Sequence, residues 1–155
     1  MSTPDRIERG TFLKVPRNRA WHALIDHRQF GAWFKVKLAA PFVVGKPASG
    51  NITHKGYEHV RWEATVDAIE PEKRFAFRWR PYAIDPKRDY SAEPTTLVEF
   101  TLEEAPGGTQ LKLVESGFAA VPEARRAEAF RMHEQGWTQQ MVNVREYVEG
   151  AAGRA

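Results

Sequence analysis

The sequence of 155 residues contains no cysteine, and this absence excludes several kinds of chemistry. The protein cannot hold a disulfide framework, a thiolate nucleophile or a zinc ion bound by cysteine. A chain without disulfides fits a reducing compartment, and we expect a cytoplasmic protein. No run approaches the roughly 18 apolar residues of a transmembrane helix, and residues 1–9 lack the apolar stretch of a signal peptide.

Short motifs that mark common active sites are also missing. The sequence has no Gly-x-Ser-x-Gly nucleophile turn, no glycine-rich phosphate loop before a helix and no His-Glu-x-x-His zinc motif. His54, Glu58 and His59 lie close together, but their spacing fits no zinc motif that we can justify. We therefore expect no metal and no cofactor, and a binding protein is favoured over an enzyme.

A strong excess of one charge is absent as well. The formal net charge is only +3, which is weak support for a polyanionic partner. Residues 74–80 interleave arginines with aromatic residues, a composition that single-strand nucleic-acid platforms also use. Alternation places the arginines on the face opposite the aromatic rings, where Glu63 and Glu99 can pair with them. We therefore expect no nucleic-acid partner.

What the sequence does contain is organised around its last long segment, residues 122–149. Apolar residues recur there at helical spacing, whereas most charged residues fall elsewhere on the helix. This pattern predicts an amphipathic helix that covers an apolar surface. Gly136 costs about 1 kcal/mol relative to alanine inside a helix, so we expect a close approach or a bend there. The apolar stripe consists of Phe130, His133, Trp137, Met141, Val144 and Val148.

The preceding segments predict the surface that this helix covers. Apolar and polar residues alternate with a period of two, which predicts strands over residues 7–15, 60–69, 74–80, 96–103 and 110–113. In the second of these strands the inward positions are Trp62, Ala64, Val66 and Ala68. Short turns separate most of the strands, so an antiparallel arrangement is the simplest one. The proline-rich residues 81–94 predict a loop.

Two short helices are predicted between the first strand and the others. Pro16 can begin the first helix, because proline is tolerated in a first turn, and Asp26 can cap the second. Weaker signals at residues 36–39 and 41–44 fit one short strand or two, and a strand at 48–54 is expected to pair next. We therefore predict one α+β domain over residues 1–155, with a core of about residues 7–149.

Four motifs in this order carry a resemblance to a known family. The first motif is Val-Pro-Arg-Asn-Arg-Ala-Trp-His-Ala-Leu at residues 15–24, followed by Trp33-Phe34. The second is the predicted strand pair over residues 62–79, whose turn contains Glu-Pro-Glu-Lys-Arg-Phe. The third is Ser116-Gly117-Phe118 after residues 108–113, and the fourth is Gly136-Trp137. Together they resemble proteins similar to the C-terminal domain of the activator of the heat-shock-protein-90 ATPase, within the START-like (SRPBCC) superfamily. The resemblance covers about residues 7–148.

The resemblance implies a helix-grip fold, in which a curved antiparallel sheet wraps around a long C-terminal helix and two short helices follow the first strand. It also implies a hydrophobic cavity between helix and sheet, and a chaperone or a second copy of the chain as a possible protein partner. The sequence departs from the family pattern at Glu115, where a histidine is common, and in residues 50–59.

Glu115 and His133 are the candidate polar residues of such a cavity. Glu115 follows Leu111 and Leu113 on the side of the strand that faces inward. It is a polar anchor or an acid/base group of the cavity in one interpretation. In the other it is a carboxylate at the strand end that reaches solvent or pairs with an arginine of the helix. His133 either faces a ligand or is a core histidine bonded to a backbone carbonyl or to Glu115. If the protein is an enzyme, these two residues are its acid/base pair.

The inward aromatic residues either line a ligand cavity or fill it as core. Our leading hypothesis is a protein that binds a small hydrophobic molecule beneath the last helix. The alternatives are a chaperone-activator-like interaction module and a small polyketide cyclase-like or hydrolase-like enzyme. The predicted ligand-binding residues are Trp33, Trp62, Phe77, Trp79, Phe100, Glu115, Phe118, His133, Trp137 and Met141.

Overall fold

The computed structural model describes residues 5–80 and 94–150, and its strands form one antiparallel sheet. The sheet order is β1-β7-β6-β5-β4-β3-β2, so the first strand of the chain pairs with the last. Most of the predicted loop at 81–94 lies outside the described residues. The strands are β1 (Arg6–Leu13), β2 (Val36–Leu38), β3 (Pro47–Ile52), β4 (Arg61–Glu70), β5 (Arg74–Trp79), β6 (Thr96–Ala105) and β7 (Gly108–Ser116).

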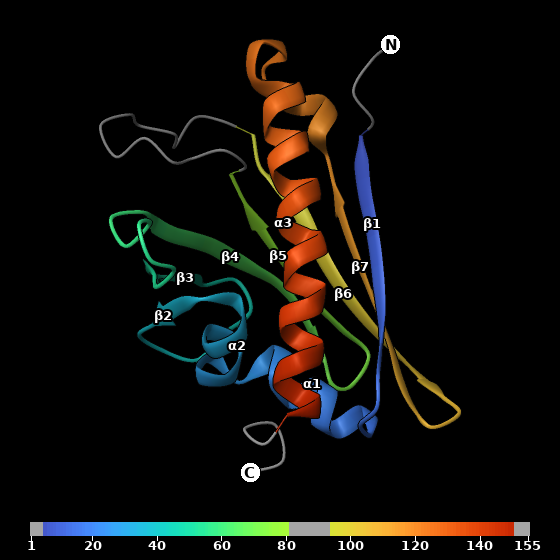
Figure 1. Ribbon diagram of the computed structural model, residues 1–155. Helices are drawn as coiled ribbons and strands as arrows, with labels where there is room; N and C mark the ends of the chain where they lie inside the picture. The colour runs from blue at the N-terminus through green and yellow to red at the C-terminus, as the bar shows by residue number, and fades with distance from the viewer. Residues whose placement is uncertain (1–4, 81–93, 151–155) are drawn as a thin grey trace.

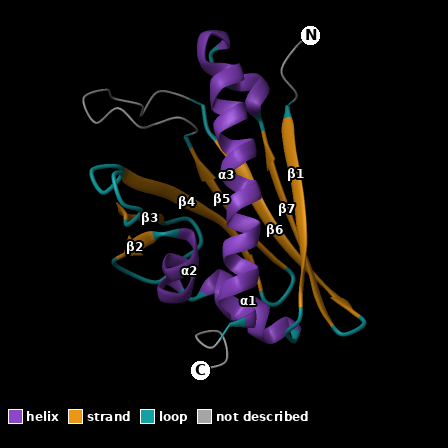
Figure 2. Cartoon of the chain, viewed as in Figure 1, coloured by secondary structure: helices purple, strands orange, loops and turns teal. Residues whose placement is uncertain are grey.

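One long helix runs along the inner face of the curved sheet, as Figures 1 and 2 show. Two short helices connect β1 at one edge of the sheet to β2 at the other, and they lie beside the C-terminal half of the long helix. The helices are α1 (Arg17–Ile25), α2 (His27–Phe34), the short 3-10 helix η1 (Phe118–Ala120) and α3 (Glu123–Glu149). The predicted helix-grip architecture is therefore confirmed.

Local hydrogen bonds fix the position of α2, which contributes one wall of the candidate site. The carboxylate of Asp26 accepts a hydrogen bond from the backbone N–H of Arg28 at 2.9 Å, so the predicted N-cap is confirmed. The indole N–H of Trp33 donates to the backbone carbonyl of Ala23 at 2.8 Å, which joins α2 to α1. These bonds place Phe34, the last residue of α2, against α3.

The strand alternation continues across the sheet in register and builds the core. Phe77 on β5 pairs with Val98 on β6, and Phe100 on β6 pairs with Leu113 on β7. All four side chains are fully buried under α3. The same register brings Glu115 opposite Val98, so a carboxylate occupies an inward position in an apolar layer.

One strand prediction was wrong in detail. A register shift on β4 lies between Val66 and Ala68, so Ile69 rather than Ala68 pairs with Phe75 and packs against the core. A bulge adds one residue to a strand and thereby reverses the inward parity beyond it. Of the two alternatives for residues 36–44, the structure has one short strand, β2, and residues 41–44 lie outside the strands.

Gly136 also differs from its prediction. The helix α3 continues through this residue without a break, and a Cβ atom built on Gly136 would have no heavy atom within 4 Å. The predicted close approach is therefore wrong, because nothing lies within 4 Å of the position that a Cβ atom would take. The residue is exposed and leaves open space above the helix.

Candidate functional site

The carboxylate of Glu115 is completely buried and accepts four hydrogen bonds. Its Oε1 atom receives Nδ1–H of His133 at 2.7 Å and the indole N–H of Trp137 at 2.8 Å. Its Oε2 atom receives the indole N–H of Trp79 at 2.7 Å and the hydroxyl of Thr96 at 2.5 Å. A carboxylate offers about four lone-pair directions, so these four donors satisfy it fully. The bond to Glu115, one alternative for His133, is confirmed.

These donors keep Glu115 ionised. Burial alone raises the pKa of its carboxyl group, because desolvation penalises the charged form. The hydrogen bond and charge of His133 act in the opposite direction, as do the hydrogen bonds from Thr96 and Trp79. Together they hold the pKa of Glu115 below its ordinary value. An ionised Glu115 only accepts hydrogen bonds, so the hydrogen between the two side chains belongs to Nδ1 of His133.

We predict that this lowered pKa makes the protein sensitive to acid. A carboxyl group with a lower pKa in the folded state stabilises the fold above its unfolded pKa, and the stabilisation disappears as the pH falls toward the folded value. The free energy of unfolding in urea should therefore begin to decrease as the pH drops below about 4.5, the ordinary value for glutamate.

Two other carboxyl groups with lowered pKa values, Asp26 and Glu58, provide the control for this prediction. A D26N/E58Q double variant removes both titrations and keeps an amide in the N-cap position of α2. The acid-dependent decrease should persist in this variant. Its disappearance would assign the effect to these two residues and contradict the contribution of Glu115.

The imidazole of His133 is held in place from three sides. Its Nδ1 atom is bonded to Glu115, and the rings of Trp79 and Phe118 lie edge to face with it at centroid distances of 5.3 and 5.8 Å. Its Nε2 atom makes no hydrogen bond within the described residues. In these residues the buried side-chain polar atoms without a hydrogen bond are Arg17 Nε and Trp62 Nε1, so Nε2 of His133 is not buried. The Nε2 atom therefore remains accessible.

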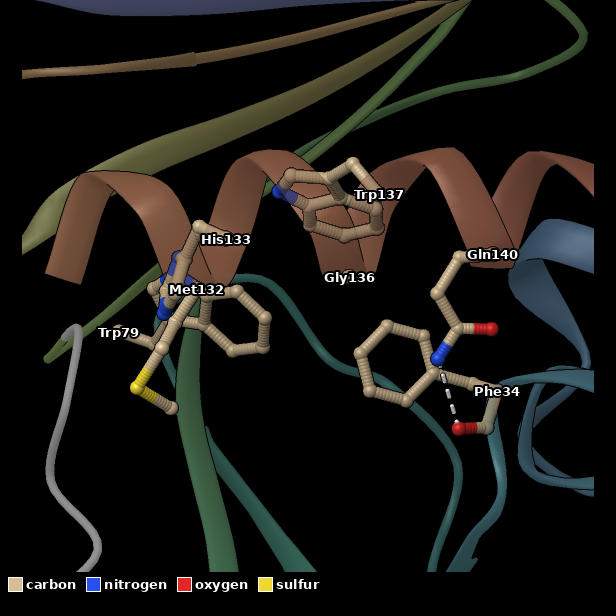
Figure 3. A pocket seen from close by; sticks show the side chains of 7 residues that line it. All are labelled: Phe34, Trp79, Met132, His133, Gly136, Trp137 and Gln140. Carbon is tan, nitrogen blue, oxygen red and sulfur yellow. Dashed lines mark hydrogen bonds between the residues drawn. The ribbon is translucent and has the colours of Figure 1, made fainter. Parts of the chain in front are cut away.

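A pocket opens beside His133, between α3, the end of α2 and the end of β5 (Figure 3). Gly136 forms its floor on α3, and the missing side chain there leaves the space free. Met132, with 38% of its surface exposed, stands at the edge next to His133. The lining residues are Phe34, Trp79, Met132, His133, Gly136, Trp137 and Gln140.

The size of this pocket limits what it can hold. Its cavity volume is about 120 Å³. An apolar cavity of about 150 Å³ binds benzene, whereas pockets for drug-sized ligands usually measure about 300–1,000 Å³. The pocket thus accommodates a single ring or a short chain, and a longer molecule would have to extend into solvent.

A second polar side chain lies at the opposite end of the pocket. The amide nitrogen of Gln140 donates to the backbone carbonyl of Phe34 at 2.9 Å, and its amide oxygen accepts from Asn143 at 3.0 Å. These two bonds fix the orientation of the amide. Its second N–H makes no hydrogen bond within the described residues. Gln140 follows His133 by seven residues, a rise of about 10 Å along the helix.

The predicted ligand-binding residues separate into two groups. Trp79, His133 and Trp137 line the pocket, while Glu115 and Phe118 contact His133 from behind it. The others pack into the buried core beneath α3, where neighbouring rings lie at centroid distances such as 5.6 Å for Trp62 and Phe77 and 6.3 Å for Trp33 and Phe100. This second group is Trp33, Trp62, Phe77, Phe100 and Met141.

Several residues of the site are not among the ligand-binding residues predicted from the sequence. Phe34 was predicted only as part of the family motif with Trp33, and Thr96 only as the first residue of the predicted strand 96–103. Met132 and Gln140 were not considered, although Gln140 lies two turns after His133 on the same side of α3. The helical spacing of residues 133, 136, 137 and 140 was the available signal.

Other parts of the described chain show how the remaining candidate residues are used. Arg74 forms ion pairs with Glu99 at 2.8 Å and with Glu70 at 3.1 Å, so the predicted partnership with Glu99 is confirmed. Glu63 pairs with Arg61 instead of residues 74–80. No group of three or more metal-ligating side chains occurs among residues 5–80 and 94–150. None of the helices in these ranges is long and apolar enough to cross a membrane.

Comparison with known proteins assigns a family. The family described as "Activator of Hsp90 ATPase homolog 1-like protein" matches residues 14–149, which include every element from α1 to α3. No curated protein matches the sequence.

Solved structures share the fold over nearly the whole chain. Protein MLL2253 from Mesorhizobium loti is 25% identical with a TM-score of 0.72, and the match covers 93% of this chain and 96% of that one. DynU16, a protein in the dynemicin biosynthetic locus, is 23% identical with a TM-score of 0.72 over 95% of this chain, which spans 48% of the DynU16 chain. The Aha1 dimer from Colwellia psychrerythraea is 16% identical with a TM-score of 0.67, and the match covers 93% of this chain and 96% of that one.

Proposed function

The chain belongs to the family of activator of Hsp90 ATPase homolog 1-like proteins, and within that fold we propose that it binds one small, mainly apolar molecule in the pocket on α3. One observation carries the proposal. The pocket is walled by aromatic and apolar side chains, and a histidine held rigidly by a buried carboxylate borders it. Ligand sites typically combine an apolar lining with a few well-placed polar groups.

The lining suggests the kind of molecule that fits. A flat ring of about the size of benzene can lie over Gly136, where no side chain competes for the space. A polar group at one end of the ring can meet Nε2 of His133, and an acceptor at the other end can meet the second N–H of Gln140. The proposed ligand is therefore a small aromatic compound with hydrogen-bonding groups at opposite ends. A role in small-molecule metabolism is in keeping with the biosynthetic locus of DynU16.

We predict that G136L abolishes ligand binding without unfolding the protein. A leucine at this position projects into the pocket from the floor, where a Cβ meets nothing within 4 Å. Leucine also favours helices more than glycine does, by roughly 0.8 kcal/mol, so the variant should be at least as stable as the wild type. Quenching of tryptophan fluorescence by 5-nitroindazole, a flat bicyclic probe of which one ring fits the pocket and the rest extends into solvent, would measure binding, because Trp79 and Trp137 line the pocket.

Q135L is the matched control for this experiment. It introduces the same side chain one residue earlier, at an exposed position that does not line the pocket. Binding should be retained in Q135L and lost in G136L. If G136L binds the probe as tightly as the wild type, the pocket on α3 is not the binding site.

The natural ligand can be sought directly. Native mass spectrometry of the purified protein, followed by organic extraction, would identify a molecule bound in stoichiometric amount, and it would also report the oligomeric state. Interaction with a chaperone ATPase is the alternative that rests on the family description alone. Recovery of the chaperone by both the wild type and G136L would support a surface-mediated role that does not need the pocket.

A further inference from the structure

We propose that His133 is a general base, and that the protein removes a proton from the small aromatic compound that it binds. This inference rests on the proposed function, because it places chemistry in the same pocket. It goes beyond binding, since it assigns a chemical step to the histidine that Glu115 orients. Figure 3 shows His133 at one end of the pocket, beside Trp79 and Met132.

The hydrogen-bond geometry determines which nitrogen can act. Glu115 occupies Nδ1 at 2.7 Å and fixes the hydrogen there, so the neutral imidazole carries its lone pair on Nε2. The Nε2 atom has no partner in the described part of the chain and is not buried. A base needs this combination of an accessible lone pair and an opposite nitrogen held by an anion, because the anion stabilises the imidazolium that forms.

Glu115 is a positioning residue in this scheme and does not act on the ligand. Its four acceptor directions are filled by His133, Trp137, Trp79 and Thr96, so none remains for a substrate. The two indole N–H groups also tie the carboxylate to β5 and α3. The base is therefore fixed relative to both walls of the pocket, which favours a defined attack geometry.

The proton transfer itself needs no cofactor. The lone pair of His133 Nε2 forms a new N–H bond, the acidic C–H bond of the substrate breaks, and its electron pair remains on the substrate. An acceptor conjugated to that carbon takes up the developing negative charge, and Gln140, which keeps a second N–H for donation, borders the pocket seven residues from His133. The proton on Nε2 then passes to water or back to the product.

A simple probe reaction tests the proposal. Base removes the C–H proton of 5-nitrobenzisoxazole, the electron pair forms a nitrile, and the N–O bond breaks to release a coloured phenolate. We expect the wild type to accelerate this reaction, and H133Q to lose roughly 100-fold of the protein-dependent rate. G136L should lose it as well, because the probe cannot enter, although the pair of His133 and Glu115 is unchanged. H59Q, which removes an exposed histidine, should keep the full rate.

The outcomes separate this inference from the proposed function. Binding of the unreactive analogue 5-nitroindazole with no difference in rate among the wild type, H133Q and G136L would overturn the general base and leave the binding pocket intact. If 5-nitroindazole does not bind and the rates do not differ among the three proteins, both the general base and the binding pocket are overturned. If H133Q does not fold, the comparison of G136L with the wild type still decides, because equal rates in these two proteins contradict chemistry in the pocket.

Discussion

E115Q should be the most destabilising conservative substitution in this protein, at a cost of about 3–5 kcal/mol. The amide has nearly the shape of the carboxylate, but its NH₂ group donates where two N–H or O–H groups already point inward. At least one buried N–H or O–H group then loses its acceptor, and each unsatisfied group costs about 1–3 kcal/mol. Because domains of this size are stable by only about 5–15 kcal/mol, urea unfolding should show a large shift in midpoint.

E103Q is the matched control for this substitution. Glu103 lies on the neighbouring strand β6 with an exposed side chain, and the same change there should cost less than about 0.5 kcal/mol. T96V removes one of the four donors and closely keeps the shape of the side chain. Its loss of stability should therefore lie between those of E115Q and E103Q. If E115Q is as stable as E103Q, the hydrogen-bonded carboxylate does not hold the helix to the sheet.

The second large effect is expected at Trp137. W137A should cost about 3–5 kcal/mol, because it empties a buried site in contact with Phe34, Trp79 and Phe100. W137F should cost about 1–3 kcal/mol, since it keeps an aromatic ring and removes the N–H that reaches Glu115 at 2.8 Å. The difference between the two variants separates packing from hydrogen bonding, and urea unfolding measures both.

The control for Trp137 lies on the same helix. R131A replaces an exposed residue of α3 and should change the free energy of unfolding by less than about 0.5 kcal/mol. W137A should also weaken binding of 5-nitroindazole, because the indole forms part of the pocket wall. A W137A variant with unchanged stability would contradict the burial of the helix stripe.

The sequence predicted the fold well because alternation and helical spacing are local signals. Leu111, Leu113 and Glu115 share one parity, so the inward direction of the carboxylate followed from the strand alone. The identity of its partners did not follow. Trp79 and Thr96 come from two other strands, and they meet Glu115 only through the register of the sheet. The bulge near Val66 was invisible for the same reason, since register is decided between strands.

The sequence predicted a cavity among the inward aromatic residues, whereas the pocket of the structure lies beside Gly136. Aromatic residues such as Trp62 and Phe77 could line or fill a cavity, and the choice depends on how well the rings fit each other. They fill the centre, so the free space lies at the margin, above Gly136. Helix propensity indicated that Gly136 had a reason to be there. It could not show whether that reason was a close neighbour or an empty volume.

The pairing of β1 with β7 has a consequence for the order of events during synthesis. β1 leaves the ribosome first, yet its partner strand follows about 100 residues later, and α3 later still. Contacts of such sequence separation slow folding, since the intervening chain must be ordered before they form. A nascent chain therefore exposes the edge of β1 and the apolar face of the hairpins until β7 and α3 have been synthesised. During that interval the chain is most prone to misassociate, and its last helix is the part that ends the exposure.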